Sequence, residues 1–299
     1  MGITAIINII TGSVEQGLIY GILALGLLIT YRILDFPDLT VDSSFPLGAA
    51  ITAVLTLQGV HPAVTLLAAA AAGALAGLVT GLIHVRCHVR DLLSGIITMT
   101  GLYSINLRLA GKANLPFFSC ETLFRNGFTK SLPAWIAPYA TVLMILLIVL
   151  IAKGLLDGYL RTKAGFLLRA AGDNASVVTT LARDVGNVKI VGLMLANALV
   201  ALSGAVMAQH QRSFDISMGT GTMVTGLASV IIGTNLFKRL GWMKSTTMVI
   251  IGSVLYKACV SVAISCGLEA QDMKLVTAVL FLLILVISQV KRKKVRIHA

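Results

Sequence analysis

Long apolar stretches alternate with short polar intervals along almost the whole chain. A helix needs about 20 consecutive apolar residues to cross the hydrocarbon core of a bilayer, and most of these stretches reach or approach that length. The pattern therefore predicts an all-α, polytopic membrane protein with about nine transmembrane helices. The predicted spans are approximately Val14–Tyr31, Ser43–Leu57, Pro62–His84, Leu92–Leu109, Ala134–Leu156, Val188–Gln209, Thr220–Leu236, Thr246–Cys266 and Leu275–Gln289.

Two of these spans, 43–57 and 220–236, are shorter than most and follow polar segments. Pro37 explains why the first span cannot continue straight into the second, because proline lacks the N–H group that a helix needs. Residues 3–10 (ITAIINII) form an apolar helix that is too short to cross. Since they lack the basic start and cleavage site of a secretory signal, we expect them to stay at the membrane interface.

The composition agrees with a membrane protein. Hydrophobic residues make up 57% of the chain and charged residues 12%, about half the charged share of a soluble domain. The formal net charge of +12 does not indicate nucleic-acid binding, because the cations cluster in short loops and at the C-terminus. In membrane proteins such clusters set the topology and attract anionic lipid headgroups.

The same cations predict the orientation. With the basic tail, residues 291–299, in the cytosol, most loop Lys and Arg residues fall on the cytosolic side and the N-terminus lies outside. The chain then forms one transmembrane domain, residues 1–299. Two halves, about residues 14–157 and 188–290, flank a cytosolic segment, 158–189.

The segment Tyr159–Lys189 is the one long polar interval in the middle of the chain. Apolar residues recur at helical spacing as far as Ala171, and Gly172-Asp173-Asn174 then interrupts the run. Gly and Asn suit a helix C-terminus, while Asp or Asn can cap a following helix. We therefore expect a helical hairpin that docks into a partner. The alternative is a basic loop that only fixes the topology.

The two halves of the chain contain an internal sequence repeat. A shift of 177 positions places Asp38-Leu39-Thr40-Val41 on Asp215-Ile216-Ser217-Met218, and Ala24-Leu25 on Ala201-Leu202. The number of spans between the copies is odd, so the copies would have opposite orientations in the membrane. Inverted repeats with interrupted helices are typical of a transport pathway. The alternative is chance similarity between apolar sequences.

The two matched segments carry most of the polar side chains expected at membrane depth. Irregular backbone survives there only when it is buried in protein or lines a wet cavity. Ser43 and Thr220 are explained best as helix caps, with Asp42 as another cap for residues 43–57. Asp38 and Asp215 fit a structural and a pathway role equally well. The pathway candidates are Asp38, Thr40, Asp42, Ser43, Ser44, Asp215, Ser217, Thr220 and Gly221.

Other candidate chemistry is weaker. Lys257, inside a span, is expected to form a structural ion pair with Glu15 or an aspartate. The four cysteines lack the spacing of metal ligands, so no metal site is expected. The chain has no P-loop, GxSxG or HExxH motif, which argues against ATP or peptide hydrolysis by this chain and gives no catalytic candidates.

Three runs resemble a known family. Residues 169–211 (RAAGDNASVVTTLARDVGNVKIVGLMLANALVALSGAVMAQHQ) are similar to the cytosolic segment and next span of ABC importer permeases of the branched-chain-amino-acid/ribose type. Residues 17–49 resemble the first two spans of that family, and residues 219–233 (GTGTMVTGLASVIIG) resemble its late Gly-rich span. The DFPDLTVD version resembles the branch that works with binding proteins for aromatic or other amino acids.

The resemblance implies a permease subunit in the cytoplasmic (inner) membrane of a bacterium, paired as a homodimer. It also implies partner ATP-binding subunits docked on the hairpin, which bind the ATP that this chain does not bind, and an extracytoplasmic substrate-binding protein. The transported compound would be a small polar solute such as an amino acid. The residues that match the coupling-helix region are Arg169, Ala170, Ala171, Gly172, Asp173, Asn174 and Ala175.

Two rival functions remain at this point. A stand-alone, ion-coupled secondary transporter would also carry inverted repeats, with Asp38 and Asp215 as ion ligands. A channel or scaffold protein is the third option. The central hairpin separates these classes, because a secondary carrier needs no docking element there.

The predicted orientation can be tested by cysteine labelling. We expect Thr129→Cys to react with a membrane-impermeant maleimide on intact cells and Ser176→Cys to remain unlabelled, because the Lys and Arg asymmetry places residue 176 in the cytosol. Labelling of Ser176→Cys alone would show that the orientation is reversed.

Overall fold

The structure is a computed structural model that describes residues 3–126, 139–173, 179, 184–238, 242–265, 275, 277–279, 281–283 and 286. Side chains are described from residue 9 onward. The described elements are α1 (Ile3–Leu27), the π-helix η1 (Leu28–Ile33), α2 (Val41–Leu57), α3 (Pro62–Arg86), α4 (Asp91–Ala110), β1 (Asn114–Pro116), α6 (Ala140–Leu160), α7 (Lys163–Asp173), α9 (Val185–Gln211), β2 (Ser213–Asp215), η3 (Ile216–Gly219), α10 (Thr222–Leu236) and α11 (Ser245–Ser265).

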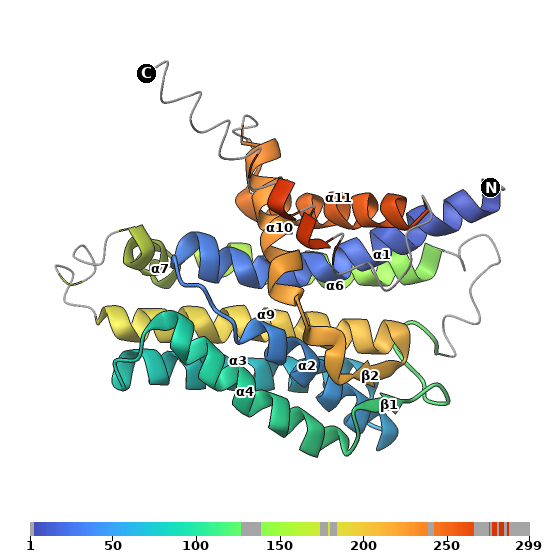
Figure 1. Ribbon diagram of the computed structural model, residues 1–299, viewed down its shortest axis with the longest axis horizontal. Coiled ribbons are helices and arrows are strands. Elements are labelled where there is room, and N and C mark those ends of the chain that lie inside the picture. Colours follow the sequence, from blue (N-terminus) through green and yellow to red (C-terminus); the bar gives the residue numbers. More distant parts are fainter. Residues whose placement is uncertain are drawn as a thin grey trace.

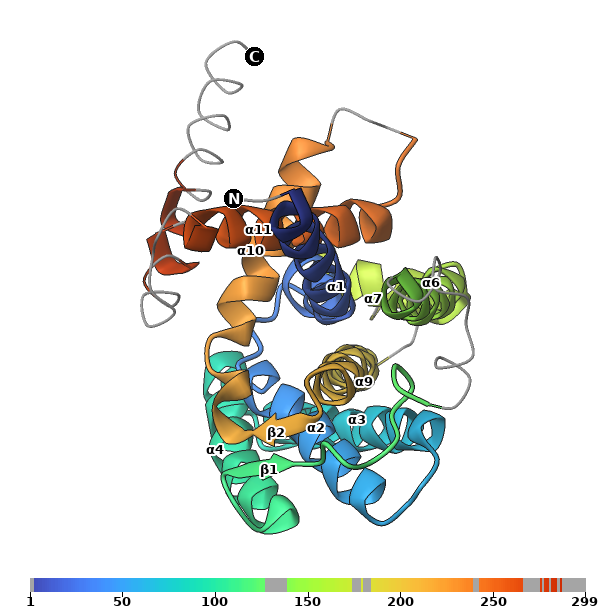
Figure 2. The same ribbon diagram turned by 90° about the vertical axis from the view of Figure 1, so that its right-hand side faces the viewer.

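The helices form two layers (Figure 1). One layer contains α1, α6 and α11, and the other contains α9, α2, α3 and α4. Helix α9 packs on α2, α3 and α1, so it joins the layers. Helix α10 crosses from the second layer to α11 in the first, and Figure 2 shows it beside the end-on helix α1.

The contact between α2 and α9 depends on glycine. A Cβ atom on Gly48 would collide with the carbonyl oxygen of Ala201, and one on Gly204 would collide with that of Phe45. The two backbones therefore touch at two points. Small residues permit such close approach between membrane helices, where van der Waals packing replaces the hydrophobic effect as the main attraction.

The long helices agree with a polytopic membrane protein. Within the described residues, six helices have the length and hydropathy to cross a membrane. They are 9–33, Pro62–Arg86, Ala140–Leu160, Val185–Gln211, 216–236 and Ser245–Ser265. Helices α2 and α4 occupy two further predicted spans without meeting those criteria. Most of the last predicted span, 275–289, lies outside the described residues.

The all-α polytopic class is confirmed, but two local details differ from the expectation. Residues 3–10 do not form a separate interfacial helix, because α1 runs without a break from Ile3 to Leu27. The all-α description also misses a two-stranded antiparallel sheet, in which Asn114 pairs with Asp215 and Pro116 with Ser213. Strands of three residues are too short to show an alternating pattern in the sequence.

The close packing of α2 on α9 predicts a stability effect. Gly204→Val should lower the free energy of unfolding by about 1–3 kcal/mol or more, because the added methyl groups meet the backbone of α2. Thermal unfolding of the purified protein in detergent measures the change. Gly154→Val is the matched control, since a side chain there would meet open space on α6. Equal melting temperatures for both variants would contradict the prediction.

Candidate functional site

The two matched segments share one local hydrogen bond. In the segment between η1 and α2, Asp38 Oδ1 accepts from the backbone N–H of Thr40 at 2.9 Å. In the segment between α9 and α10, Asp215 Oδ1 accepts from the N–H of Ser217 at 2.7 Å. This side-chain turn satisfies a backbone donor where the helix is interrupted. The shift of 177 positions therefore relates residues with the same local geometry.

Asp38 lies at the centre of a buried polar network. Asn197 of α9 donates from Nδ2 to Asp38 Oδ2 at 2.7 Å, and Ser44 donates to Asn197 Oδ1 at 2.7 Å. The Thr40 hydroxyl lies 2.8 Å from that of Thr80 on α3. These side chains are wholly buried. In this conformation the network fastens the start of α2 to α3 and α9.

Asp42 holds the N-terminus of α10. Its carboxylate accepts from the N–H groups of Gly221 at 3.2 Å and Met223 at 2.8 Å, and from the Thr222 hydroxyl at 3.0 Å. A carboxylate at a helix N-terminus satisfies unpaired donors and complements the helix dipole. The two interrupted segments thus meet through this one side chain.

The capping roles expected within each segment were wrong. Thr40 is the N-cap position of α2 and makes no side-chain cap bond, while the Ser43 hydroxyl donates to Met99 O of α4 at 2.8 Å. Gly221, with a φ of 81°, is the N-cap position of α10, and Thr220 donates to Ser217 O at 2.7 Å. Asp42 therefore caps the helix of the other segment.

The remaining candidates do not all come together. Asp215 belongs to the small sheet, in which Asn114 Nδ2 also donates to its Oδ2 at 3.2 Å. Ser217 and Thr220 are exposed. Asp38 belongs instead to the buried network on α3 and α9. The structure joins Asp42 of one segment with the α10 end of the other, places Ser44 in the Asp38 network through Asn197, and leaves Asp38 and Asp215 apart.

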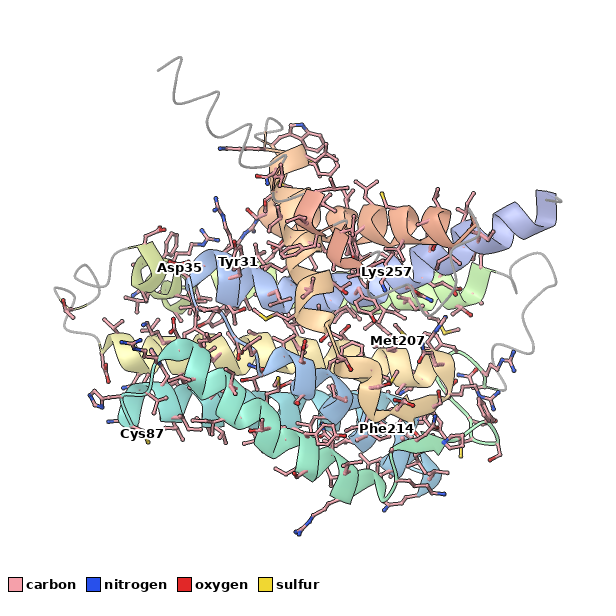
Figure 3. All side chains as sticks on the ribbon, viewed as in Figure 1. Tyr31, Asp35, Cys87, Met207, Phe214 and Lys257 are labelled. Atoms are coloured by element: carbon pink, nitrogen blue, oxygen red, sulfur yellow. The ribbon has the colours of Figure 1, made fainter. Side chains whose placement is uncertain are left out.

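At the opposite end of the bundle, α7 borders a cavity of about 670 Å³. Arg169, Asp173 and the exposed Phe166 contribute to its lining from α7, and Arg32 contributes from η1. Leu168 and Ala171 are buried on the inner face of the helix. Figure 3 places Asp35 and Cys87 toward this end and Phe214 toward the other. The predicted coupling residues Asn174 and Ala175 lie outside the described residues.

Gly172 has a packing role. A Cβ atom there would collide with the carbonyl oxygen of Ile33 at the end of η1. The predicted break at Gly172 therefore coincides with a close contact between α7 and the start of the first interrupted segment. Ala170, one of the coupling candidates, is half-buried on α7.

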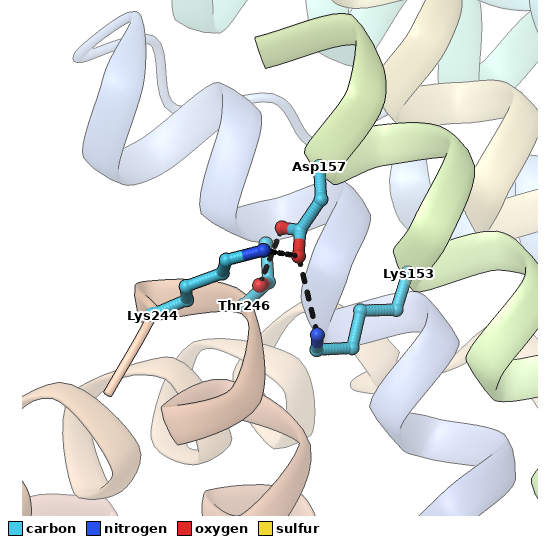
Figure 4. Close-up of polar contacts among 4 residues, drawn as sticks. All are labelled: Lys153, Asp157, Lys244 and Thr246. Carbon is cyan, nitrogen blue, oxygen red and sulfur yellow. Dashed lines mark hydrogen bonds and ion pairs between the residues drawn. The ribbon is translucent and has the colours of Figure 1, made fainter. Parts of the chain in front are cut away.

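An acidic side chain that the sequence analysis missed organises the same cavity. Asp157 of α6 binds Lys153 at 3.2 Å, Lys244 at 2.9 Å and the Thr246 hydroxyl at 2.7 Å (Figure 4). These bonds fasten the end of α6 to the start of α11. Its i,i+4 spacing from Lys153 was the available signal.

The expected pairing of Lys257 with an acidic group was wrong. Glu15 instead accepts from His210 Nε2 at 3.0 Å. The ammonium group of Lys257, which is labelled on α11 in Figure 3, lies 3.7 Å from the ring centroid of Tyr20 on α1. A cation over an aromatic ring is electrostatically favourable and stabilises this charge without a carboxylate.

The fold and the interrupted segments define a multi-pass helical membrane protein in which two helices begin inside the bundle and are joined by polar side chains. The chain belongs to the family of branched-chain amino acid transport system permease components, whose model matches residues 9–288. It is therefore a permease component of a transport system, a membrane subunit and not an enzyme. This confirms the family resemblance found in the sequence.

Two relatives match nearly full length. The tyrosine transport system permease protein of Clostridioides difficile (strain R20291) is 44% identical over 279 residues, which cover 93% of this chain and 90% of the relative. An uncharacterized protein of Rickettsia prowazekii (strain Madrid E) is 31% identical over 290 residues, covering 96% of this chain and 99% of the relative. No solved structure matches the chain.

The Asp42 contact predicts a cost when its carboxylate is removed. Asp42→Ala should lower the free energy of unfolding by about 1–3 kcal/mol, because three donors at the start of α10 lose their acceptor. Thermal unfolding in detergent checks the change. Asp35→Asn is the control, since Asp35 is exposed and its φ of 51° suits Asn. A melting temperature of Asp42→Ala equal to that of the control would contradict the capping role.

Proposed function

We propose that this chain is the membrane subunit of a binding-protein-dependent ABC importer and moves an amino acid or a related small polar solute across the bacterial inner membrane. Family membership and the likeness to a relative named as a tyrosine transport permease support an amino-acid substrate. Partner subunits bind and hydrolyse the ATP. A second copy of the chain and an extracytoplasmic binding protein complete the importer.

The observation that carries the proposal is the placement of α7. This helix buries Leu168 against the bundle and presents Phe166 and Arg169 outward. An exposed aromatic ring beside charged groups is typical of a docking surface. Basic side chains outnumber acidic ones in the lining of the adjacent cavity, with Arg32 and Arg161 among its cations. A partner with acidic and apolar groups would complement it.

The contacts of α7 provide a route from that surface to the interrupted helices. Gly172 touches the carbonyl of Ile33, and the side chains of Leu168 and Leu34 both approach Gly192 of α9. The chain continues from Leu34 to Asp38, the centre of the buried network. Because these groups pack without space between them, a displacement of α7 would move the start of α2.

The transport cycle then follows as alternating access. Closure of the partner ATPases displaces α7, and the bundles rock so that the cavity opens to one side and then the other. The proposed pathway includes the matched segments from Asp38 to Ser44 and from Asp215 to Gly221. In the present conformation Asp38 and Thr40 are buried. The proposal requires a second conformation that exposes them.

Charge reversal on α7 tests this function. We co-express the chain with the ATP-binding subunit and the binding protein of the proposed importer, and measure co-purification of the ATPase and uptake of radiolabelled L-tyrosine. Arg169→Glu and Asp173→Arg should reduce both by about tenfold, because each reverses the charge of a side chain that lines the cavity beside α7 and with which a docked partner would have to pair. Lys163→Glu is the matched control, since it reverses an exposed charge at the start of α7. Gly172 is not substituted, because its packing against Ile33 would confound the result.

The outcomes separate the candidate functions. Uptake that follows an ion gradient and proceeds without any ATPase would indicate a stand-alone secondary transporter. Normal co-purification and uptake in both variants would show that α7 is not the docking element.

A further inference from the structure

A second, smaller cavity of about 200 Å³ lies at the other end of the bundle. It is lined by the middle of α1, the end of α9, the segment 122–125 and the first turn of α6. Glu15, Phe124, Arg125, His210 and Arg212 contribute to its lining. The charge-based orientation puts this end outside the cell, so a solute arriving from outside reaches it first.

Hydrogen bonds fix the wall of this cavity. Gln209 of α9 accepts from Leu123 N at 3.1 Å, and donates to Pro62 O at 2.9 Å and Thr65 Oγ1 at 3.0 Å. Thr122 and Arg125 exchange backbone hydrogen bonds, which close the segment into a turn. The Phe124 side chain is buried and its ring meets His210 edge-on, with 6.1 Å between the ring centroids. The wall is therefore shaped before any ligand arrives.

The cavity also holds polar groups whose bonding is incomplete. His210 Nε2 lies 3.0 Å from Glu15 Oε2, which leaves the opposite ring nitrogen, Nδ1, for another partner. Within the described part of the chain, His210 Nδ1 and Arg212 Nε are buried without a hydrogen-bond partner. A buried polar atom without a partner costs free energy that a ligand can recover. These two atoms come from neighbouring positions at the end of α9.

We propose that this cavity is an outer binding site for a free amino acid, in which Arg212 and Arg125 bind the α-carboxylate and Glu15 binds the α-ammonium group. The inference rests on the proposed function and adds the substrate groups that the chain itself recognises. Guanidinium groups match carboxylates in geometry and charge. The lining supplies both signs of charge, as a zwitterion requires, whereas an inorganic anion would use only its cations.

The position of the site links recognition to the interrupted helices. Glu15 belongs to α1, whose other end leads into the segment that contains Asp38, and His210 and Arg212 end α9, which leads into the segment that contains Asp215. A ligand held between these groups would draw the middle of α1 and the end of α9 together. The site therefore touches the two helices that precede the matched segments.

Binding to the purified full-length chain in lipid nanodiscs tests the site. The probes are L-tyrosine, tyramine, which lacks the carboxylate, and 3-(4-hydroxyphenyl)propionate, which lacks the ammonium group. We expect L-tyrosine to bind about tenfold or more tightly than either analogue, the effect of one hydrogen bond to a charged group. Sodium phosphate is a further probe, and binding of phosphate equal to that of L-tyrosine would overturn the proposal in favour of a simple anion site.

Paired variants assign the two recognition roles. Arg212→Gln should abolish the preference for L-tyrosine over tyramine. Glu15→Gln should abolish the preference for L-tyrosine over 3-(4-hydroxyphenyl)propionate. Arg108→Gln and Glu121→Gln are matched controls, because both alter exposed charges that do not line the cavity. Unchanged preferences in Arg212→Gln and Glu15→Gln would overturn the proposal. Where a variant is poorly folded, Arg212→Lys keeps the charge, and its loss of the preference over tyramine would count against the role of the cation.

A transport measurement separates this inference from the proposed function. L-tyrosine uptake by the intact wild-type system, without L-tyrosine binding to the purified chain, would refute the outer site and leave the importer function standing. Absence of uptake for every proteinogenic amino acid would refute the proposed function itself. Uptake that falls about tenfold in Arg212→Gln, with normal co-purification of the ATPase, supports both.

Discussion

The carboxylate of Asp42 is the contact on which the arrangement of the interrupted helices depends. Helices that begin inside a membrane protein expose backbone N–H groups where no water can bind them. Asp42, in the first turn of α2, supplies the acceptor for α10, at 2.8 Å from Met223 N. One helix start thereby completes the hydrogen bonding of the other. Neither segment can move far without leaving buried donors unpaired, so the two starts form one mechanical unit.

Helix α9 supports this unit from the other side. Its Asn197 binds Asp38 and Ser44 together, and its Gly204 allows the backbone of α2 to touch it near Phe45. Hydrogen bonds and close backbone contact are the interactions that stay strong between helices in lipid. The polar residues of the Asp38 network are thus compatible with stability, because each has a partner inside the bundle. Because these side chains are buried and hydrogen-bonded in this conformation, a pathway can open between them only if they exchange their hydrogen-bond partners.

The sequence predicted the features that depend on local pattern. It did not predict the contacts of side chains whose partners lie in distant segments. Apolar length located most of the helices, and the shift of 177 positions found two segments that share one side-chain turn. Asp42 was expected to cap its own helix, and only the folded arrangement shows that it caps α10. Glu15 and Lys257 were expected to pair by charge, yet Glu15 binds His210 and Lys257 lies on Tyr20. Opposite charge indicates which side chains could form an ion pair, but helix packing determines which of them come into contact.

Helices α1 and α9 connect the two ends of the molecule. At one end they contact α7, through η1 and Gly192, and at the other they hold the Glu15–His210 pair. Between these ends they pack on each other, with Gly26 touching the carbonyl of Ala196. Packed helices shift as rigid bodies over small distances and do not deform continuously. Closure of the outer cavity and displacement of α7 would therefore act on the same pair of helices. The two matched segments follow α1 and α9 in the chain. Movement at the outer cavity and movement of α7 would therefore both reach the contact between Asp42 and the start of α10. The hydrogen bonds of Asp42 must then either persist or be replaced by bonds to other groups.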